Sequence, residues 1–366
     1  MEVYLNMKII IATGGSGGHL FPALRVAQVL KGKGHDIFFL GSFRLGKEKI
    51  KESGFVFEDI GAIGLTKGIS QKTFYSIICM SRAFFRALWV VRRFHPGVVI
   101  GFGGYGAFPV VLSAVLLRRP TLIHEQNVIP GRTNALLSKG VKRIAISFQK
   151  SVKYFSAKKT FLTGCPCHFP EGKMDREAIF NAFHLDPDKK TFFVFGGSQG
   201  SQRINEIFLE TAQYLKKSIN FQVIHVSGGQ NHGEIENQYN QLGIPFALFE
   251  FLDKMEDAYQ VSDLVISRSG AGTVHEIAIF GVPAIFIPYP HAGGHQRANA
   301  SVLCDLNLAW LIEEKDLSAQ KLGDMILEVC EGYLNMENTS KGYEDVYIAG
   351  ADEKIAQEAL EIGLCG

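Results

Sequence analysis

Short apolar runs alternate with stretches of helical spacing along most of the chain. Lys8–Ala12 and Ile37–Leu40 are compact apolar runs, and residues from about Pro22 to Lys31 between them repeat apolar positions at helical spacing. Parallel strands need such a helical crossover and are buried on both faces, so this pattern predicts a doubly wound parallel sheet. Ligands of these sheets collect at the carboxyl ends of the strands.

A glycine turn after an apolar strand occurs twice. Thr13–His19 reads Thr-Gly-Gly-Ser-Gly-Gly-His, and the run Thr191–Phe195 leads into Gly196–Gly200, which reads Gly-Gly-Ser-Gln-Gly. The first turn is a poor dinucleotide fingerprint, because its third glycine is missing and no carboxylate ends the second strand, and it lacks the Gly-Lys-Ser/Thr of a P-loop. The repeat predicts an α/β protein with two Rossmann-like domains facing a cleft. Their expected bounds are residues 1–165 and 166–345, with an outer helix over 346–366.

A third strand, turn and helix run from Asp263 to Phe280. Residues 263–267 form an apolar strand, a glycine turn follows, and Thr273–Phe280 has helical spacing up to Gly281. Unpaired N–H groups and the dipole of such a helix suit a phosphate or diphosphate. Glu276, one turn inside, can accept ribose hydroxyls, although an ordinary strand–helix corner with a surface Glu has the same pattern. The polar loop Tyr289–Asn299 favours a nucleotide-sugar site.

Charge is unevenly distributed along the 366 residues. The net charge is +2, yet residues 1–170 hold 24 Lys and Arg against 7 Asp and Glu, and residues 171–366 hold 14 against 29. A basic half indicates an anionic partner, either nucleic acid or a membrane surface. Thr73–Arg93 has one apolar helical face with Arg82, Arg86 and Arg93 beside it. This helix is either a domain helix with a solvated basic edge or one resting on anionic lipid with Trp89 at the boundary.

Two features argue against other classes of protein. Gly97–Leu117 is 21 residues long without a charge, but glycines and Pro109 interrupt it, which favours a strand, a loop and a helix over a membrane span. Six cysteines give no disulfide framework, and Cys165-Pro-Cys167-His168 lacks a second pair at ligand spacing, so no metal site is expected. No signal peptide is visible at Met1 or Met7, and we expect a cytoplasmic protein.

Two further polar segments follow apolar strands in the basic half. Gly101–Gly106 reads Gly-Phe-Gly-Gly-Tyr-Gly, and Thr121–Ile123 runs into His124-Glu-Gln-Asn127. Glu125 is the only acidic residue from Gly61 to Pro170. At the carboxyl end of a strand it is either a charge partner for a neighbouring Arg or a general base.

Together these motifs closely resemble one family over Lys8 to about Leu311. Their order and spacing are similar to the MurG family, the bacterial undecaprenyl-diphospho-muramoylpentapeptide N-acetylglucosaminyltransferases of GT-B family 28. The motifs are Thr13–His19, Gly101–Tyr105, His124–Asn127, Gly196–Gly200, and Arg268–Ala271 with Glu276 and Gln296.

The resemblance implies a GT-B fold and an inverting transfer of N-acetylglucosamine without a metal or other cofactor. The donor would be UDP-N-acetylglucosamine and the acceptor a lipid-linked muramoyl-pentapeptide of peptidoglycan synthesis. The anionic partner would then be a membrane surface and not nucleic acid. The enzyme would be peripheral, on the cytoplasmic face of the bacterial inner membrane.

An inverting transfer needs a general base, for which His19 and Glu125 are the candidates. Acceptor contacts would come from Gly103, Gly104 and Tyr105, and membrane contacts from Arg82, Arg86 and Arg93 of the basic helix. One departure is that His168 ends Gly164-Cys-Pro-Cys-His168, where the family has Arg after Gly-Asn-Pro-Val; His carries a less constant positive charge. The donor contacts carried over are Ser16, Gly17, Gly18, Asn127, His168, Ser198, Leu252, Ala271, Gly272, Thr273, Val274, His275, Glu276 and Gln296.

Two alternative functions fit the same motifs. A UDP-N-acetylglucosamine epimerase of GT-B fold would need no lipid acceptor, and the basic amphipathic helix argues against it. A non-catalytic UDP-sugar-binding membrane scaffold would bind the donor without turnover.

Overall fold

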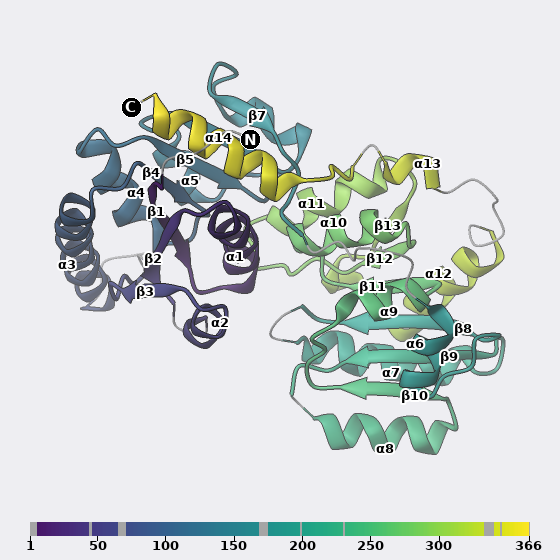
Figure 1. The fold of residues 1–366 in the computed structure, drawn as a ribbon. Coiled ribbons are helices and arrows are strands. Elements are labelled where there is room, and N and C mark those ends of the chain that lie inside the picture. Colours follow the sequence, from purple (N-terminus) through teal and green to yellow (C-terminus); the bar gives the residue numbers. More distant parts are fainter. Residues whose placement is uncertain are drawn as a thin grey trace. The chain divides into compact units, whose positions relative to one another are not determined.

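The chain forms two compact α/β units, shown in Figure 1. A computed structural model describes residues 6–43, 46–64, 71–167, 175–197, 200–229, 231–332, 340–344 and 346–365. Unit 1 comprises Met1–Cys167 and Ile348–Gly366, and unit 2 comprises His168–Tyr347. Each unit holds one parallel sheet, which confirms the predicted class of two doubly wound parallel-sheet domains.

The sheet of unit 1 has the strand order β3-β2-β1-β4-β5-β6-β7, and its described strands all pair in parallel. The order reverses at β1, whose neighbours are β2 and β4. Loops that leave the carboxyl ends of β1 and β4 therefore lie at the switch point where such sheets bind ligands. The strands are β1 (Lys8–Gly14), β2 (Asp36–Ser42), β3 (Val56–Asp59), β4 (Val98–Gly101), β5 (Thr121–Glu125), β6 (Arg143–Ile146) and β7 (Thr160–Leu162).

Helices cover both faces of this sheet. Ile9 and Ile11 of β1 pack with α1 and α14, whereas Ile10 and Ala12 pack with α3 and α4. The alternation follows from the two-residue period of a strand. As expected, the uncharged stretch 97–117 divides into β4, a glycine loop and α4. The helices are α1 (Gly17–Gly32), α2 (Lys47–Glu52), α3 (Gln71–Phe94), α4 (Ala107–Leu116), α5 (Arg132–Leu137), the short 3-10 helix η1 (Gln149–Tyr154) and α14 (Ala351–Leu364).

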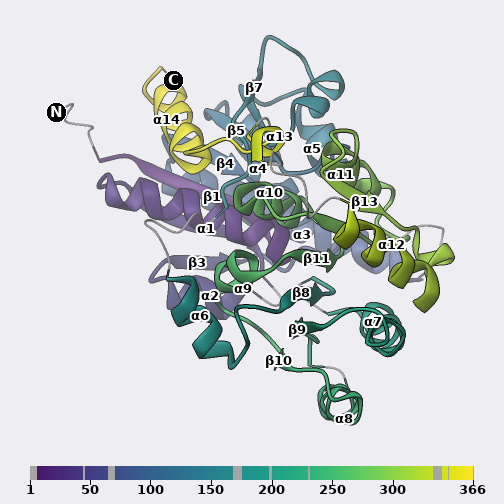
Figure 2. The same cartoon turned by 90° about the vertical axis from the view of Figure 1, so that its right-hand side faces the viewer.

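The last helix belongs to unit 1 although unit 2 precedes it in the chain. α14 lies beside α1, as Figures 1 and 2 both show. Its residues Ile355, Ala356 and Ala359 are completely buried in the core of that face. Burial of one apolar stripe, and not the charged composition of residues 346–366, decides where this helix packs.

Unit 2 repeats the arrangement with the strand order β10-β9-β8-β11-β12-β13, and its described strands again pair in parallel. Its order reverses at β8, between β9 and β11. The strands are β8 (Lys190–Phe195), β9 (Phe221–Val226), β10 (Phe246–Phe249), β11 (Leu264–Ser267), β12 (Ala284–Phe286) and β13 (Ala309–Leu311).

The core of unit 2 joins the sheet to three helices. Phe192 and Val194 of β8 pack with apolar residues of α7, α8 and α12. On the opposite face, Phe193 packs edge-to-face on Tyr259 of α9. The helices are α6 (Arg176–Phe183), α7 (Gln202–Leu215), α8 (His232–Leu242), α9 (Met255–Val261), α10 (Ala271–Phe280), α11 (His295–Cys304), η2 (Glu314–Asp316), α12 (Ala319–Glu331) and α13 (Ser340–Tyr343).

Candidate functional site

In unit 1 two glycine turns meet at the switch point of the sheet. The N–H of Gly14 donates to the carbonyl of Gly103 at 3.1 Å. Gly103 and Gly104 have φ of 85° and 76°, and a Cβ on Gly104 would lie 3.1 Å from the Cα of Gly14. Only glycine combines this left-handed backbone with so close an approach of two chains.

His19 lies in the first turn of α1, directly against this pair of glycines. A Cβ on Gly103 would be 3.2 Å from the His19 Cε1 atom, and one on Gly104 would be 3.2 Å from Cδ2. Ser16, the N-cap of α1, makes no side-chain capping bond, and the first turn holds no acidic residue. The half-buried imidazole therefore lies beside a helix N-terminus suited to an anion.

Glu125 is buried, and both of its carboxylate oxygens accept two hydrogen bonds. Oε1 accepts from the backbone N and the Nδ2 of Asn127, at 2.9 and 3.1 Å. Oε2 accepts from the Gly131 N at 3.0 Å and the Asn134 Nδ2 at 2.9 Å. Four donors saturate the oxygens and fold residues 126–134 back onto the end of β5.

This geometry fits a positioning role for Glu125 better than that of a general base. A base must present an oxygen to the hydroxyl whose proton it takes. The Glu125 oxygens instead hold Asn127 and Asn134 in place. The Gln126 Nε2 adds a bond of 2.8 Å to the carbonyl of Phe102, which ties the same segment to the glycine loop after β4.

In unit 2 the carboxyl end of β11 leads into the N-terminus of α10. Gly270 is the N-cap, with extended backbone and no side-chain capping bond, and the first turn holds no acidic residue. The backbone N–H groups of Ala271, Gly272 and Thr273 occupy this turn, where a helix has no internal acceptors. Val274 and His275 are buried, and the His275 ring bonds to the Ala271 carbonyl at 2.9 Å. Their side chains therefore support the turn from within the unit.

Glu276 lies one turn further along α10. The residue is half-buried, and burial raises the pKa of its carboxyl group. The Tyr259 hydroxyl donates to Oε2 at 2.8 Å and acts in the opposite direction on the pKa. A Cβ on Gly272 would lie 3.8 Å from Oε1, so this second oxygen lies beside the first turn of the helix.

Arg268 ties together three segments at the carboxyl edge of this sheet. It is 7% exposed and forms an ion pair with Glu314. Its guanidinium also donates to the Ser201 Oγ at 2.9 Å and to the Ile287 carbonyl at 3.0 Å. In the sequence, Arg268 is recognisable only as a member of the Arg268–Ala271 motif. Nothing in the spacing of that motif indicates that Arg268 connects these three segments.

Gln296 and Leu252 complete the residues expected around the donor. The Gln296 Oε1 accepts from the Tyr289 N at 2.8 Å, and its backbone carbonyl accepts from the Ser269 Oγ at 2.9 Å. Leu252 is half-buried in the loop between β10 and α9. These bonds fix the loop after β12 against the turn before α10.

Sequence comparisons cover both units. Residues 9–146 match the glycosyltransferase family 28 N-terminal domain, and residues 191–355 match the glycosyltransferase family 28 C-terminal domain. The chain belongs to glycosyltransferase family 28.

Two relatives of this family 28 chain are both named UDP-N-acetylglucosamine–N-acetylmuramyl-(pentapeptide) pyrophosphoryl-undecaprenol N-acetylglucosamine transferase. The protein from Halothermothrix orenii is 38% identical, over 88% of this chain and 90% of its own length. The protein from Thermodesulfovibrio yellowstonii is 35% identical, over 97% of this chain and 98% of its own length.

Solved structures agree with this membership. The crystal structure of Acinetobacter baumannii MurG superimposes with a TM-score of 0.78 at 26% identity, over 97% of this chain and 99% of its own. A structure from Listeria monocytogenes, named a putative UDP-N-acetylglucosamine 2-epimerase, has a TM-score of 0.67 at 11% identity, over 96% of this chain and 95% of its own. At that identity only the fold is shared, so the fold alone does not separate transferase from epimerase.

Two predicted donor contacts, His168 and Ser198, lie outside the described residues. The remaining predicted contacts divide between the units. Ser16, Gly17, Gly18, Asn127 and the glycine loop with Tyr105 belong to unit 1, and Leu252, the turn 271–276 and Gln296 belong to unit 2. Among the described residues, no three His, Cys, Asp or Glu side chains group to hold a metal ion.

Helix α3 exposes a row of large apolar side chains. Phe74 and Phe85 are 67% and 66% exposed, while small residues such as Ala83 and Ala87 face the core. By length and composition alone α3 could cross a membrane, but its buried face packs on α4 and the sheet of unit 1. A groove of about 340 Å³, lined by residues that include Ile77, Phe84 and Leu112, follows α3 and α4.

The predicted basic edge of α3 is present in the structure. Arg82, Arg86 and Arg93 are all exposed. The guanidinium groups of Arg86 and Arg93 lie 4.6 and 5.2 Å from the ring centroid of Trp89. Arg86 also pairs with Glu58 at 2.5 Å, so Arg82 and Arg93 are the better candidates for an external anion.

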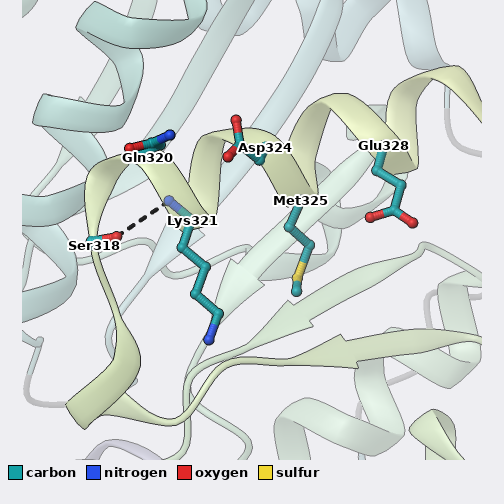
Figure 3. A pocket seen from close by; sticks show the side chains of 6 residues that line it. All are labelled: Ser318, Gln320, Lys321, Asp324, Met325 and Glu328. Carbon is teal, nitrogen blue, oxygen red and sulfur yellow. Dashed lines mark hydrogen bonds between the residues drawn. The ribbon is translucent and has the colours of Figure 1, made fainter.

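A polar groove of about 350 Å³ lies along α12 in unit 2 (Figure 3). Its lining side chains follow one another along this helix and do not converge on a point. The Ser318 Oγ accepts from the backbone N of Lys321 as an N-cap, which is a structural role. The groove contains none of the predicted site residues.

We expect Glu125→Gln to lower stability and turnover together. An amide NH₂ would face two N–H donors, and unpaired buried groups cost about 1–3 kcal/mol. The melting temperature should fall by about 2–10 °C, as measured by calorimetry. Asn134→Ala keeps the Glu125 carboxylate and should lower the melting temperature and kcat in parallel. Loss of kcat in Glu125→Gln at an unchanged melting temperature, with Asn134→Ala fully active, would instead identify Glu125 as the base.

Proposed function

We propose that this protein transfers N-acetylglucosamine from UDP-N-acetylglucosamine to undecaprenyl-diphospho-N-acetylmuramoyl-pentapeptide, a step of peptidoglycan synthesis. The observation that carries the proposal is the similarity, at up to 38% identity and across both units of the chain, to relatives that are named for this activity. Two helix N-termini at the switch points of the two sheets support it, because both substrates contain a diphosphate.

The donor binds to unit 2 in this proposal. The first-turn N–H groups of α10 bind the diphosphate, and the helix dipole stabilises the charge that develops on the departing UDP. Glu276 accepts the ribose hydroxyls, and the backbone at Leu252 pairs with the edge of uracil. The side-chain oxygen Oε1 of Gln296 already accepts from the Tyr289 N, so the side-chain NH₂ group is the donor for a sugar hydroxyl.

The acceptor binds to unit 1, and His19 is the general base. In an inverting transfer, the acceptor hydroxyl attacks the anomeric carbon on the side opposite to UDP, and a base removes its proton. The Glu125 oxygens each accept two hydrogen bonds. His19 lies on Gly103 and Gly104, the loop assigned to the acceptor, so its imidazole is the better candidate.

The exposed face of α3 docks on the anionic membrane that holds the lipid acceptor. Exposed Phe74, Phe85 and Trp89 supply apolar area, and Arg82 and Arg93 supply positive charge beside it. This combination is typical of a helix lying in the membrane interface. The protein would therefore be peripheral, on the cytoplasmic face of the inner membrane.

The function is tested with purified protein, UDP-N-acetylglucosamine and a polyprenyl-diphospho-muramoyl-pentapeptide. We expect UDP release coupled to formation of the disaccharide lipid, and no reaction with the donor alone. An isomer of the donor formed without acceptor would favour the epimerase. Tight donor binding without turnover on any acceptor would favour the scaffold.

His19→Gln tests the base. Loss of a general base lowers kcat by roughly 10²–10⁴-fold, and we expect this with little change in donor affinity. Near-normal kcat at saturating acceptor, or a defect confined to donor affinity, would remove His19 from this role.

Reversing Arg82 and Arg93 to Glu tests the membrane surface. Each basic residue near an anionic bilayer contributes on the order of 1 kcal/mol, so binding to phosphatidylglycerol vesicles should fall by more than tenfold in a sedimentation assay. Donor affinity should not change. The exposed pair Lys217 and Lys321 of unit 2, also reversed to Glu, is the charge-matched control. Equal losses in both variants would mean that only net charge matters.

A further inference from the structure

Tyr259 of α9 is held in one orientation by an aromatic cage. The residue is 1% exposed. Its ring packs edge-to-face on Phe193 and Phe195, with centroids 5.2 and 6.0 Å away, and stacks on Phe280 at 5.4 Å. Enclosure on these sides prevents the ring from swinging away, so the position of the hydroxyl is fixed by packing.

The hydroxyl of Tyr259 forms a hydrogen bond with one oxygen of the Glu276 carboxyl group. It donates to Oε2 at 2.8 Å. Oε1 lies beside the first turn of α10, where a Cβ on Gly272 would be 3.8 Å away. The bond from Tyr259 therefore fixes the carboxyl plane and turns the second oxygen towards the segment that would bind the donor.

Tyr259 also opposes the electrostatic penalty on Glu276. Burial raises the pKa of the Glu276 carboxyl, the hydrogen bond from Tyr259 lowers it, and the charge of Glu256 on α9 raises it. α11 packs on α10 as well, and its Arg297 is paired with Glu313 at 3.2 Å. On α10 itself, the neighbouring His275 bonds to the Ala271 carbonyl.

We propose that Tyr259 is a positioning residue that orients the Glu276 carboxylate for the ribose of the nucleotide donor. This role rests on the proposed function, since it assumes that Glu276 accepts ribose hydroxyls. The residue never contacts the donor and acts only through Glu276. It thereby contributes to the selection of a ribonucleotide over a 2′-deoxyribonucleotide.

Tyr259→Phe is the direct test, because it keeps the ring and removes the hydroxyl. Hydrogen bonds to charged groups are strong enough that we expect the KM for UDP-N-acetylglucosamine to rise roughly 5- to 20-fold, with kcat at saturating donor unchanged. Removing the bond raises the pKa of the Glu276 carboxyl further. Donor affinity should therefore be lost at a higher pH on acidification than in the wild type.

Two companion measurements separate orientation from packing. UDP should bind more tightly than 2′-deoxyuridine diphosphate to the wild type, and calorimetry should show a smaller ratio in Tyr259→Phe. Glu256→Gln removes a charge that raises the pKa of the Glu276 carboxyl. Donor affinity in this variant should therefore be lost at a lower pH than in the wild type, the opposite of the change in Tyr259→Phe. If Tyr259 had only a structural role, Tyr259→Phe would change neither the ratio of the two nucleotide affinities nor the pH at which donor affinity is lost.

Tyr239→Phe is the matched control. Tyr239 is also buried in unit 2, and its hydroxyl bonds to the His225 Nδ1 at 2.8 Å, on the other face of the sheet. We expect wild-type donor affinity from this control. A Tyr259→Phe protein with wild-type KM and pH profile, or one that is destabilised far more than Tyr239→Phe, overturns the proposal.

Glu276→Gln distinguishes failure of this inference from failure of the proposed function. Donor affinity should fall in Glu276→Gln, and adding Tyr259→Phe should cause little further loss, because both changes act on one carboxylate. Unchanged affinity in Glu276→Gln would disprove the donor site itself. A fall in Glu276→Gln with full additivity in the double variant would disprove only the role of Tyr259.

Discussion

The backbone N–H groups in the first turns of α1 and α10 are the constraint on which the rest of the proposed site depends. A helix cannot satisfy its first N–H groups internally, and a doubly wound sheet places such helix ends at the carboxyl edge of its strands. In each unit the helix follows a strand at the switch point, and its N-cap provides no side-chain bond. An anion can occupy the position that a capping side chain would otherwise fill.

Keeping these helix ends open requires other polar groups to hold the surrounding loops. In unit 1, Glu125 binds the segment 126–134 with four hydrogen bonds. In unit 2, Arg268 joins the N-cap of α7, the end of β12 and Glu314. A buried charge is tolerated only when it is fully bonded, so these two residues stabilise the loops through bonds they cannot easily give up.

Much of this could be predicted from the sequence, for identifiable reasons. Strand–helix alternation and the glycine turns specify two parallel sheets, because both signals are local. The hydrogen-bond partners of Glu125 could not be predicted, since Gly131 and Asn134 follow it in a loop whose fold the pattern does not determine. The exposure of Phe74 and Phe85 could not be predicted either, because an apolar helical face has the same sequence pattern whether it packs on a core or faces a membrane.

The number of hydrogen bonds that a charged side chain already makes within the protein distinguishes a residue that holds the structure together from one that can bind a ligand. Glu125 and Glu276 are both carboxylates within α/β units, and the sequence alone offers each as a functional group. Glu125 accepts two bonds at each oxygen, whereas Tyr259 occupies Oε2 of Glu276 and Oε1 lies beside the open turn of α10. An oxygen in that position can exchange water for a ligand hydroxyl without breaking a protein bond, and substrate binding requires this. In the proposed donor site, the enclosed tyrosine would let Glu276 remain partly buried and still accept the ribose hydroxyls.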